Sequence, residues 1–397
     1  MPSRQCCFSF FVRHAVFPRK IKAKYVPCVA QNRDWVYNGV YCIDLIKGVF
    51  IDMSNPSCPK VDIGGQAVLE GVMMKAPEHI AIAVRRENGD VIVKREKYES
   101  PAKKHKWMAL PFIRGSVNMV QMLSMGMNTL TQATEMLGVE AEEPSKFEKW
   151  LAEKLGKSVD KVVMAVAAIL AVCLSVGMFV LLPNLIIKAF PAAATGGMLL
   201  LKNLASGIVR IVILIAYIAL AGRIPDMYRT FQYHGAEHKT VYCHEHDLPL
   251  TPANARNFTT LHPRCGTSFL LITFVLSIVF YSVIDVLVLM LTGFDLGGNY
   301  FVRILTRLLL LPVIAGISYE ALKSLAHHDG PFVRMMRWPG LMMQKLTTHN
   351  PTDEMLQVAI VSMQTALNGL PEGEATKEGW VRLTKEQVNA LTGVENA

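Results

Sequence analysis

The sequence has little charge for its length. Only 18% of its 397 residues are Asp, Glu, Lys or Arg, whereas 51% are hydrophobic. Soluble globular chains carry about 25% charged residues, so a single water-soluble domain is not expected. The high apolar content also excludes disorder over most of the length. No run of basic residues interleaved with aromatic ones is present, so we predict no nucleic-acid partner.

The sequence also lacks a disulfide framework. Five of its eight cysteines lie between Cys6 and Cys58, at spacings that do not indicate paired thiols. Of the remaining three, Cys173 lies in an apolar run, where it packs as a small hydrophobic residue. Cys243 and Cys265 lie in or beside a cluster of histidines, so only these two are candidates for chemistry.

Residues 1–60 lack sustained apolar periodicity and any signal peptide, because no apolar core is followed by a small-residue cleavage site. From Val61 onward the sequence is patterned and punctuated by glycine. We therefore expect translation to begin at Met53, with residues 1–52 the product of a start codon assigned too early. The alternative is a genuine, poorly ordered extension.

Four apolar stretches are long enough to cross ~30 Å of hydrocarbon at about 1.5 Å per residue. They cover residues 162–187, 199–221, 267–291 and 300–322. Short connectors rich in Gly, Ala or Pro join the first stretch to the second and the third to the fourth. We therefore predict two antiparallel transmembrane hairpins, with a kink or an end at Pro183.

The distribution of basic residues predicts how these spans are oriented. Lys and Arg gather in the loop 222–266 and after residue 322, whereas the other two connectors carry few of them. The positive-inside rule places that loop and both termini in the cytoplasm. The net charge of +9 is consistent with segments beside anionic lipid, so the bilayer is the expected partner. A homo-oligomer or an unknown membrane partner stays open.

Charged residues inside the spans need partners in the hydrocarbon. Asp285 in the third span and Arg303 and Arg307 in the fourth lie at overlapping depths, which predicts an ion pair between the two helices. Arg210 lies near the middle of the second span. An interhelical pair that fixes the bundle is one interpretation, and a transport pathway is the other.

Residues 61–160 read as a small cytoplasmic α+β portion. Ile80–Arg86 and Val91–Tyr98 alternate in hydropathy and flank an Asn-Gly pair, which predicts a β-hairpin. The glycines of the preceding segment, 64–75, indicate turns or close backbone approach.

A methionine-rich helix is predicted over residues 111–137. Basic residues and Trp107 precede it, which favours the membrane surface, although a plain core helix fits the pattern equally well. One stripe of the helix is apolar: Val120, Leu123, Met127 and Leu130. After the spans we expect cytoplasmic helices within 323–370, one of them over 352–367, and then a tail, 371–397, with one short helix.

Five of the eleven histidines fall within residues 234–262: His234, His238, His244, His246 and His262. The first two belong to the motif His-Gly-Ala-Glu-His. On a helix, histidines four residues apart share a face and can bind one ion, with Glu237 adjacent as a base.

A second motif, His262-Pro-Arg-Cys265-Gly, places an imidazole and a thiol three residues apart where the third span begins. Together with His234 and His238 it predicts a zinc site of three nitrogens and one sulfur, with Glu237 as the catalytic residue. His327 and His328 would reach the same membrane face. The alternatives are a closed structural zinc site, and no metal at all, with the histidines on a solvated helix face.

These motifs resemble the YqhQ-like family of bacterial membrane proteins of unknown function. The resemblance covers about residues 61–370 and rests on these stretches: Gly64–Met74, Arg114–Gly115, Phe231–Lys239, His262–Phe269, Trp338–Leu341 and Asp353–Leu367. It implies a bacterial cell-membrane location and a metal-dependent enzyme, a label that is itself inferred from such histidines.

The sequence therefore predicts a mainly α-helical, multi-pass inner-membrane protein with four transmembrane helices and a small α+β N-terminal portion. The leading functional hypothesis is a zinc-dependent hydrolase at the cytoplasmic membrane face. The alternatives are a non-enzymatic scaffold or assembly factor with a structural His/Cys loop, and a small transporter that uses Arg210 and the charged residues of the last two spans.

Overall fold

The computed structural model describes residues 42–43, 50–51, 63–100, 105–138, 150, 154, 159–188, 196–294, 296, 300–327, 330–377 and 379–394. The chain forms two compact units, Met1–Pro59 and Lys60–Ala397. In the first unit, β1 (Cys42–Ile43) pairs antiparallel with β2 (Phe50–Ile51). The expected start at Met53 concerns residues that the structure leaves undescribed. His328 and the side chains of Arg303 and His327 are also outside the described part.

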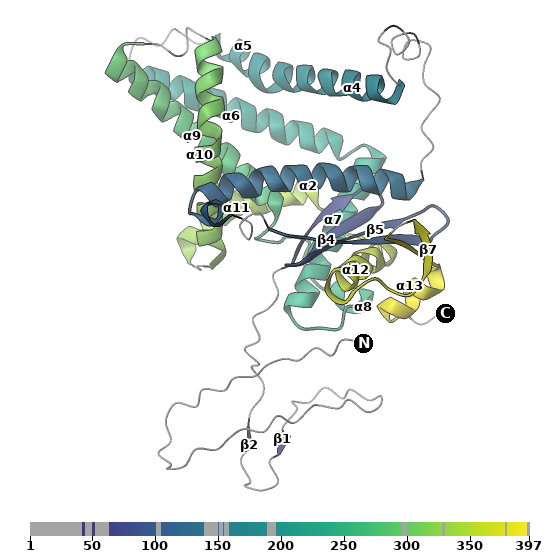
Figure 1. Cartoon of the computed structure of the whole chain (residues 1–397). Helices are drawn as coiled ribbons and strands as arrows, with labels where there is room; N and C mark the ends of the chain where they lie inside the picture. Colours follow the sequence, from purple (N-terminus) through teal and green to yellow (C-terminus); the bar gives the residue numbers. More distant parts are fainter. Residues whose placement is uncertain are drawn as a thin grey trace. The chain divides into compact units, whose positions relative to one another are not determined.

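The second unit contains an antiparallel sheet, which lies beneath α2 in the view of Figure 1. Its six strands have the order β3-β4-β5-β6-β8-β7. The first four strands come from the predicted N-terminal portion: β3 (Gly64–Val68), β4 (Gly71–Lys75), β5 (His79–Arg85) and β6 (Val91–Lys97). The predicted hairpin is confirmed as β5 and β6. Gly89 supplies the positive φ of +89° that its turn requires.

The segment after residue 370 is more than the predicted tail with one short helix. It contributes the strands β7 (Glu374–Lys377) and β8 (Trp380–Leu383), and β8 pairs with β6 so that Val381 lies opposite Val93. The short helix is present as α13 (Lys385–Thr392) and begins with a capping box. The strands escaped prediction because each has only four residues, too few for an alternating pattern to stand out.

Helices cover both faces of the sheet because its strands are apolar on both sides. On one face, alternate residues such as Ala81 and Ala83 pack against α7 (Pro225–Glu245) and α12 (Asp353–Asn368). On the other face, Ile82 and Val84 pack against α2 (Ile113–Leu137), which follows the short helix η1 (Lys106–Ala109). The predicted helices over 111–137 and 352–367 are therefore confirmed.

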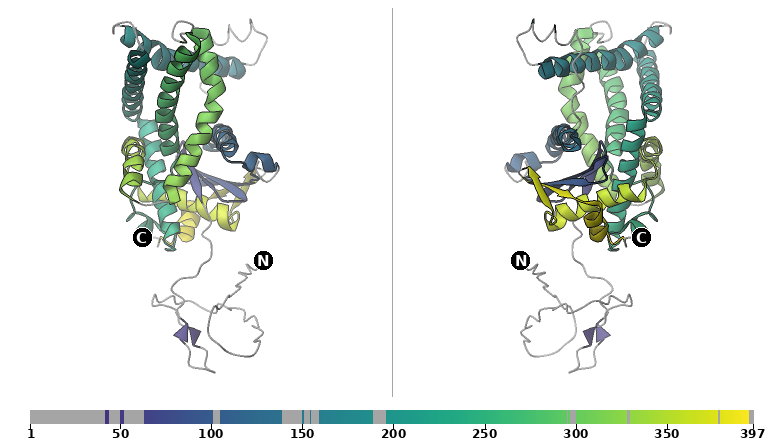
Figure 2. Two further views of the ribbon diagram at one scale, coloured as in Figure 1. Left: turned by 90° about the vertical axis from the view of Figure 1, so that its left-hand side faces the viewer. Right: turned by 90° about the vertical axis from the view of Figure 1, so that its right-hand side faces the viewer.

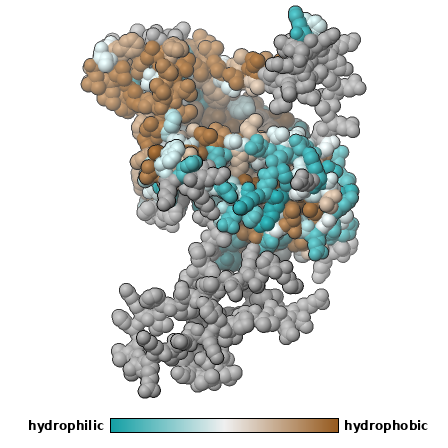
Figure 3. Space-filling view, in the orientation of Figure 1, coloured by the Kyte–Doolittle hydropathy of each residue, from teal (hydrophilic) through white to brown (hydrophobic). Residues whose placement is uncertain are grey.

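Within the described part of the chain, four helical segments are long and apolar enough to cross a membrane, as predicted: Val166–Ile187, Gly197–Ala221, Gly266–Thr292 and Ile304–Leu325. They belong to α4 (Val159–Val176) with its continuation to residue 188, to α6 (Gly196–Ala221), to α9 (Gly266–Thr292) and to α10 (Tyr300–His327). Figure 3 shows hydrophobic residues gathered over these helices, and Figure 2 shows the sheet and α12 at one end of them.

The predicted irregularity at Pro183 takes the form of a π-helical turn. The turn, η2 (Gly177–Leu181), lies between α4 and α5 (Leu182–Lys188). Proline has no N–H to donate to the carbonyl four residues earlier, so the regular α-helical ladder cannot continue through it. A π turn is one of the ways in which a helix absorbs such a break.

The ion pair predicted between the last two spans is confirmed for Arg307, whose Nη2 lies 3.5 Å from Asp285 Oδ2. Asn203 of α6 donates a hydrogen bond to the same carboxylate at 3.1 Å, so three spans meet at this charge. A cavity of about 230 Å³ lies next to the pair, and its lining includes Arg210 and Ser206.

Candidate metal centre

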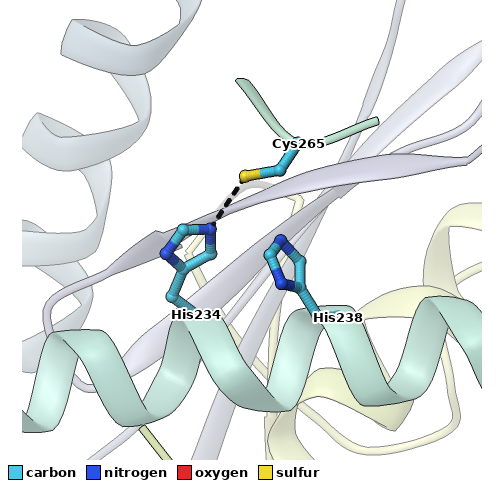
Figure 4. Close-up of side chains that lie close together, drawn as sticks. All are labelled: His234, His238 and Cys265. Carbon is cyan, nitrogen blue, oxygen red and sulfur yellow. Dashed lines mark hydrogen bonds between the residues drawn. The ribbon is translucent and has the colours of Figure 1, made fainter. Parts of the chain in front are cut away.

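The His-Gly-Ala-Glu-His motif lies in the middle of α7. This helix begins at Pro225, whose fixed φ suits the first turn, and Asp226 in that turn complements the positive end of the helix dipole. Four residues is close to one helical turn, so His234 and His238 project from the same face (Figure 4).

Cys265 meets these two histidines from another part of the chain. It is the N-cap residue of α9, and its Sγ lies 3.2 Å from His234 Nε2. One ligand atom from each of His234, His238 and Cys265 lies within 4.8 Å of the others. The structure therefore brings together three of the four predicted ligands. The segment 246–264, which includes the short helix α8 (Pro252–Ala255), connects the two elements that carry them.

Backbone carbonyls fix the orientation of both imidazoles. Nδ1 of His234 lies 2.8 Å from the carbonyl oxygen of Thr347, and Nδ1 of His238 contacts that of Thr260. A carbonyl only accepts hydrogen bonds, so each Nδ1 carries the proton and each Nε2 presents a lone pair. Histidines that bind metals are oriented in this way by groups behind them.

His238 Nε2 is a buried polar atom with no hydrogen-bond partner among the described residues. Leaving such an atom unsatisfied is costly, and native structures usually pair it with a protein group, water or an ion. Burial also lowers the pKa of His238, against a smaller opposing effect of Cys265, so the ring is neutral and able to coordinate. The donor set of two imidazoles and a thiol therefore fits a metal ion of zinc's chemistry.

Glu237 lies beside the cluster and is buried. Burial raises the pKa of its carboxyl group, and His234 and a hydrogen bond from the Gly65 backbone partly offset that effect. A Cβ atom at Gly65 would lie 2.8 Å from Glu237 Cγ and 2.6 Å from the Met73 carbonyl oxygen. The close approach predicted for the glycines of this segment therefore occurs at the carboxylate itself.

His262 lies outside the three-residue cluster. The centre of its ring is 5.6 Å from that of His238, and its Nε2 lies 3.4 Å from Glu245 Oε1. The buried Gln344 holds its backbone, accepting from the His262 N–H at 2.7 Å and donating to its carbonyl at 2.8 Å. His262 therefore shapes the wall of the site, with its imidazole directed at a carboxylate.

The supporting groups were missed by sequence reasoning. The carbonyls of Thr260 and Thr347 orient the histidines, and Gln344 of α11 (Pro331–Thr347) holds His262. Backbone carbonyls carry no signature of residue type. Gln344 gave one weak signal, as an amide on the buried side of an amphipathic helix, where an unpartnered polar group would be costly.

Among the described residues, two cavities share lining residues with the cluster. One has a volume of about 330 Å³, and its lining includes Lys75, Arg264 and His238. The other has a volume of about 420 Å³ and is mainly apolar. Glu237 and Cys265 line both of them, so the cluster lies where the two cavities meet.

Comparison with known proteins gives two matches. A family model described as a protein of unknown function, DUF1385, matches residues 110–369, which include α7 and Cys265. The chain is also similar to the uncharacterized protein YqhQ of Bacillus subtilis (strain 168), with 32% identity over 308 residues, 77% of this chain and 92% of YqhQ. No solved structure matches the chain.

Proposed function

The chain belongs to the DUF1385 family, as its motifs predicted, and we propose that it is a membrane enzyme whose metal ion is held by His234, His238 and Cys265. The observation that carries the proposal is the buried Nε2 of His238, which points at the thiol without a hydrogen-bond partner among the described residues. Both histidines have Nδ1 fixed by a carbonyl, which leaves the Nε2 of each ring to act as a ligand, and the ligand atoms of the cluster lie within 4.8 Å of one another.

Three ligands favour a catalytic site over a closed structural one. Structural zinc sites use four protein ligands, whereas catalytic sites use three and leave a position for water or substrate. His262, the fourth ligand predicted from the sequence, directs its Nε2 at Glu245. When bound, a zinc ion would supply a Lewis acid that lowers the pKa of water.

Glu237 is the proposed general base. Its carboxylate lines both cavities, so water that enters either one reaches it. Burial raises the pKa of this carboxyl group, which makes its carboxylate a stronger base toward water, and the proton it takes can pass to a leaving group. The reaction class that these groups support is hydrolysis.

We place the site at the cytoplasmic face of a bacterial inner membrane. The candidate ligands lie on α7 and at the start of α9, at the end of the spans that carries the basic loop 222–266. Positive loops remain on the cytoplasmic side during membrane insertion, which supports this orientation for both termini as well.

Metal analysis of detergent-purified protein tests the proposal. We expect close to one zinc ion per chain in the wild type and less than a tenth of that in His234→Ala/His238→Ala. His246→Ala is the matched control, because this exposed histidine ends the same helix and its Nδ1 bonds the Tyr242 carbonyl, away from the cluster. Equal, near-zero metal in all three proteins would refute the proposal.

Transport is a second candidate, and one observation favours it. The cavity of about 230 Å³ between the spans includes Arg210 and Arg307 in its lining, which would suit an anion. Uptake of inorganic phosphate or chloride by proteoliposomes, lost in Arg210→Gln, would support transport. Uptake no faster than in empty vesicles would reject it.

A further inference from the structure

Helix α2 exposes a stripe of large apolar side chains. The exposed fractions are 62% for Val120, 56% for Leu123, 66% for Met127 and 38% for Leu130. A helix of the protein core would bury such residues. Exposed apolar stripes of this kind mark contact with a membrane or a partner, so the membrane-surface interpretation of this segment is the favoured one.

The start of α2 is attached to the last half of the span in α10. Gly115 approaches Gly316 so closely that a Cβ on Gly115 would lie 2.8 Å from Gly316 Cα. Arg114 next to it donates two hydrogen bonds of 2.6 Å to Glu320, and α2 runs crosswise to α10 (Figure 1). Glu320 lies five residues before the end of the span at Leu325, so α2 lies at the level of the membrane surface.

The apolar cavity of about 420 Å³ lies under this stripe. Leu123, Met127 and Leu130 of α2 line it together with Leu270 of α9. Leu270 lies four residues into the third span, or about 6 Å along its axis, and half of its surface is exposed. The cavity is therefore continuous with the surface that faces lipid tails.

The inner side of this cavity reaches the candidate metal centre, and a more polar cavity lies beyond. His234, Glu237 and Cys265 line the apolar cavity. The adjoining cavity of about 330 Å³ contains two cations, Lys75 and Arg264. Arg264 is paired with Glu245, whereas Lys75 Nζ lies 4.2 Å from the centre of the Tyr98 ring.

We infer that the two cavities bind one amphiphile, an anionic phospholipid drawn from the bilayer, and that this lipid class is the substrate of the proposed enzyme. The acyl chain lies in the cavity under α2, and the anionic headgroup lies in the cavity of Lys75. The junction between them passes Glu237 and Cys265, which line both cavities. The substrate assignment rests on the proposed function, but the binding itself does not.

Binding of fluorescent phospholipids to the full chain in detergent tests the inference. We expect saturable binding of NBD-phosphatidylglycerol that is at least fivefold tighter than that of zwitterionic NBD-phosphatidylcholine. Lys75→Gln should abolish the preference, because it removes a cation from the headgroup cavity. Leu123→Gln should weaken binding of both lipids about equally, because it places a polar side chain in the cavity that holds the acyl chain. Val120→Gln is its matched control, on the same exposed stripe but outside both cavities.

The lipid measurement is read together with the metal analysis of the wild-type chain, to separate this inference from the proposed function. Saturable lipid binding by a wild-type chain that holds no metal would leave the lipid site standing and remove the enzyme. A wild-type chain that holds metal but shows no saturable lipid binding would support the enzyme and remove the lipid site. Equal affinity for both lipids, or equal loss in Val120→Gln and Leu123→Gln, would overturn the inference. So would a dimer in light scattering that Leu123→Gln dissociates, because a second copy would then cover the stripe.

Discussion

His234 Nε2 lies 3.2 Å from Cys265 Sγ, although the two residues are far apart in the chain. The contact joins the middle of α7 to the residue just before a membrane span, so the candidate metal centre is built at the junction between the sheet-containing part and the membrane helices. Substitutions of the cysteine and of the histidines therefore test the contribution of each element to metal binding.

Replacing Cys265 by serine should lower zinc affinity by roughly 100-fold or more, since loss of groups that only support a ligand already costs about 10–100-fold. Competition with a chromophoric chelator measures the change. Cys173→Ser is the control, because Cys173 is exposed on α4 and outside the cluster. Unchanged affinity in Cys265→Ser would show that the thiol is not a ligand.

Replacing His262 by glutamine should leave the zinc content near one per chain, because the imidazole is directed at Glu245 and not at the cluster. His238→Gln, under the same conditions, should lose most of the metal. The pair of variants decides between three ligands and the four that the sequence predicted. A loss as complete in His262→Gln as in His238→Gln would restore the four-ligand site.

Gly65→Ala should destabilise the protein by about 1–3 kcal/mol, because the added methyl group would press on Glu237 and on the Met73 carbonyl. A lower Tm of the detergent-solubilised protein would report the effect. Gly64→Ala is a close control, since a Cβ at Gly64 meets nothing within 4 Å. The interpretation fails if the two substitutions shift Tm equally.

The ion pair between Arg114 and Glu320 should couple α2 to α10 by about 1 kcal/mol, since both side chains are partly exposed and the bond is bidentate. A double-mutant cycle with Arg114→Ala and Glu320→Ala measures the coupling. Arg114→Lys should recover only part of it, because lysine cannot form the paired geometry. Strict additivity of the two alanine substitutions would contradict a direct interaction.

Asp285→Ala should cost about 3 kcal/mol, because it leaves the Arg307 guanidinium without this carboxylate inside the membrane. Asp285→Ala/Arg307→Met should be less damaging than the single change, since the charge then disappears with its partner. Thermal unfolding in detergent compares the variants. If the double variant is the less stable one, the pair is not the main role of Arg307.

The spans and the hairpin of β5 and β6 were predictable because their signals are local. About twenty consecutive apolar residues already specify a membrane helix, and an Asn-Gly pair between alternating strands specifies a tight turn. The face that His234 and His238 share followed from helical periodicity alone. Each of these conclusions needed only residues that are neighbours in the chain.

The remaining features depend on contacts between distant segments. The His262 ring is directed at Glu245, at the end of the preceding long helix. The His262 backbone is held by Gln344, which lies beyond two membrane spans in the chain. The carbonyls that fix the two ligand histidines have no side-chain signature. The pairing of β8 with β6 joins opposite ends of the second unit, and no periodicity within either strand records it.

The pairing of β8 with β6 determines when the sheet can be completed during synthesis. The N-terminal strands emerge from the ribosome before the spans, and β6 can pair with β5 at once. Its second neighbour, β8, is made only after the four spans, when Val381 can pair with Val93. At roughly 5–20 residues per second, synthesis of the intervening chain takes about a quarter of a minute to one minute. Throughout that interval β6 presents an open edge, which nascent-chain chaperones or the insertion machinery would have to shield until the last strands arrive.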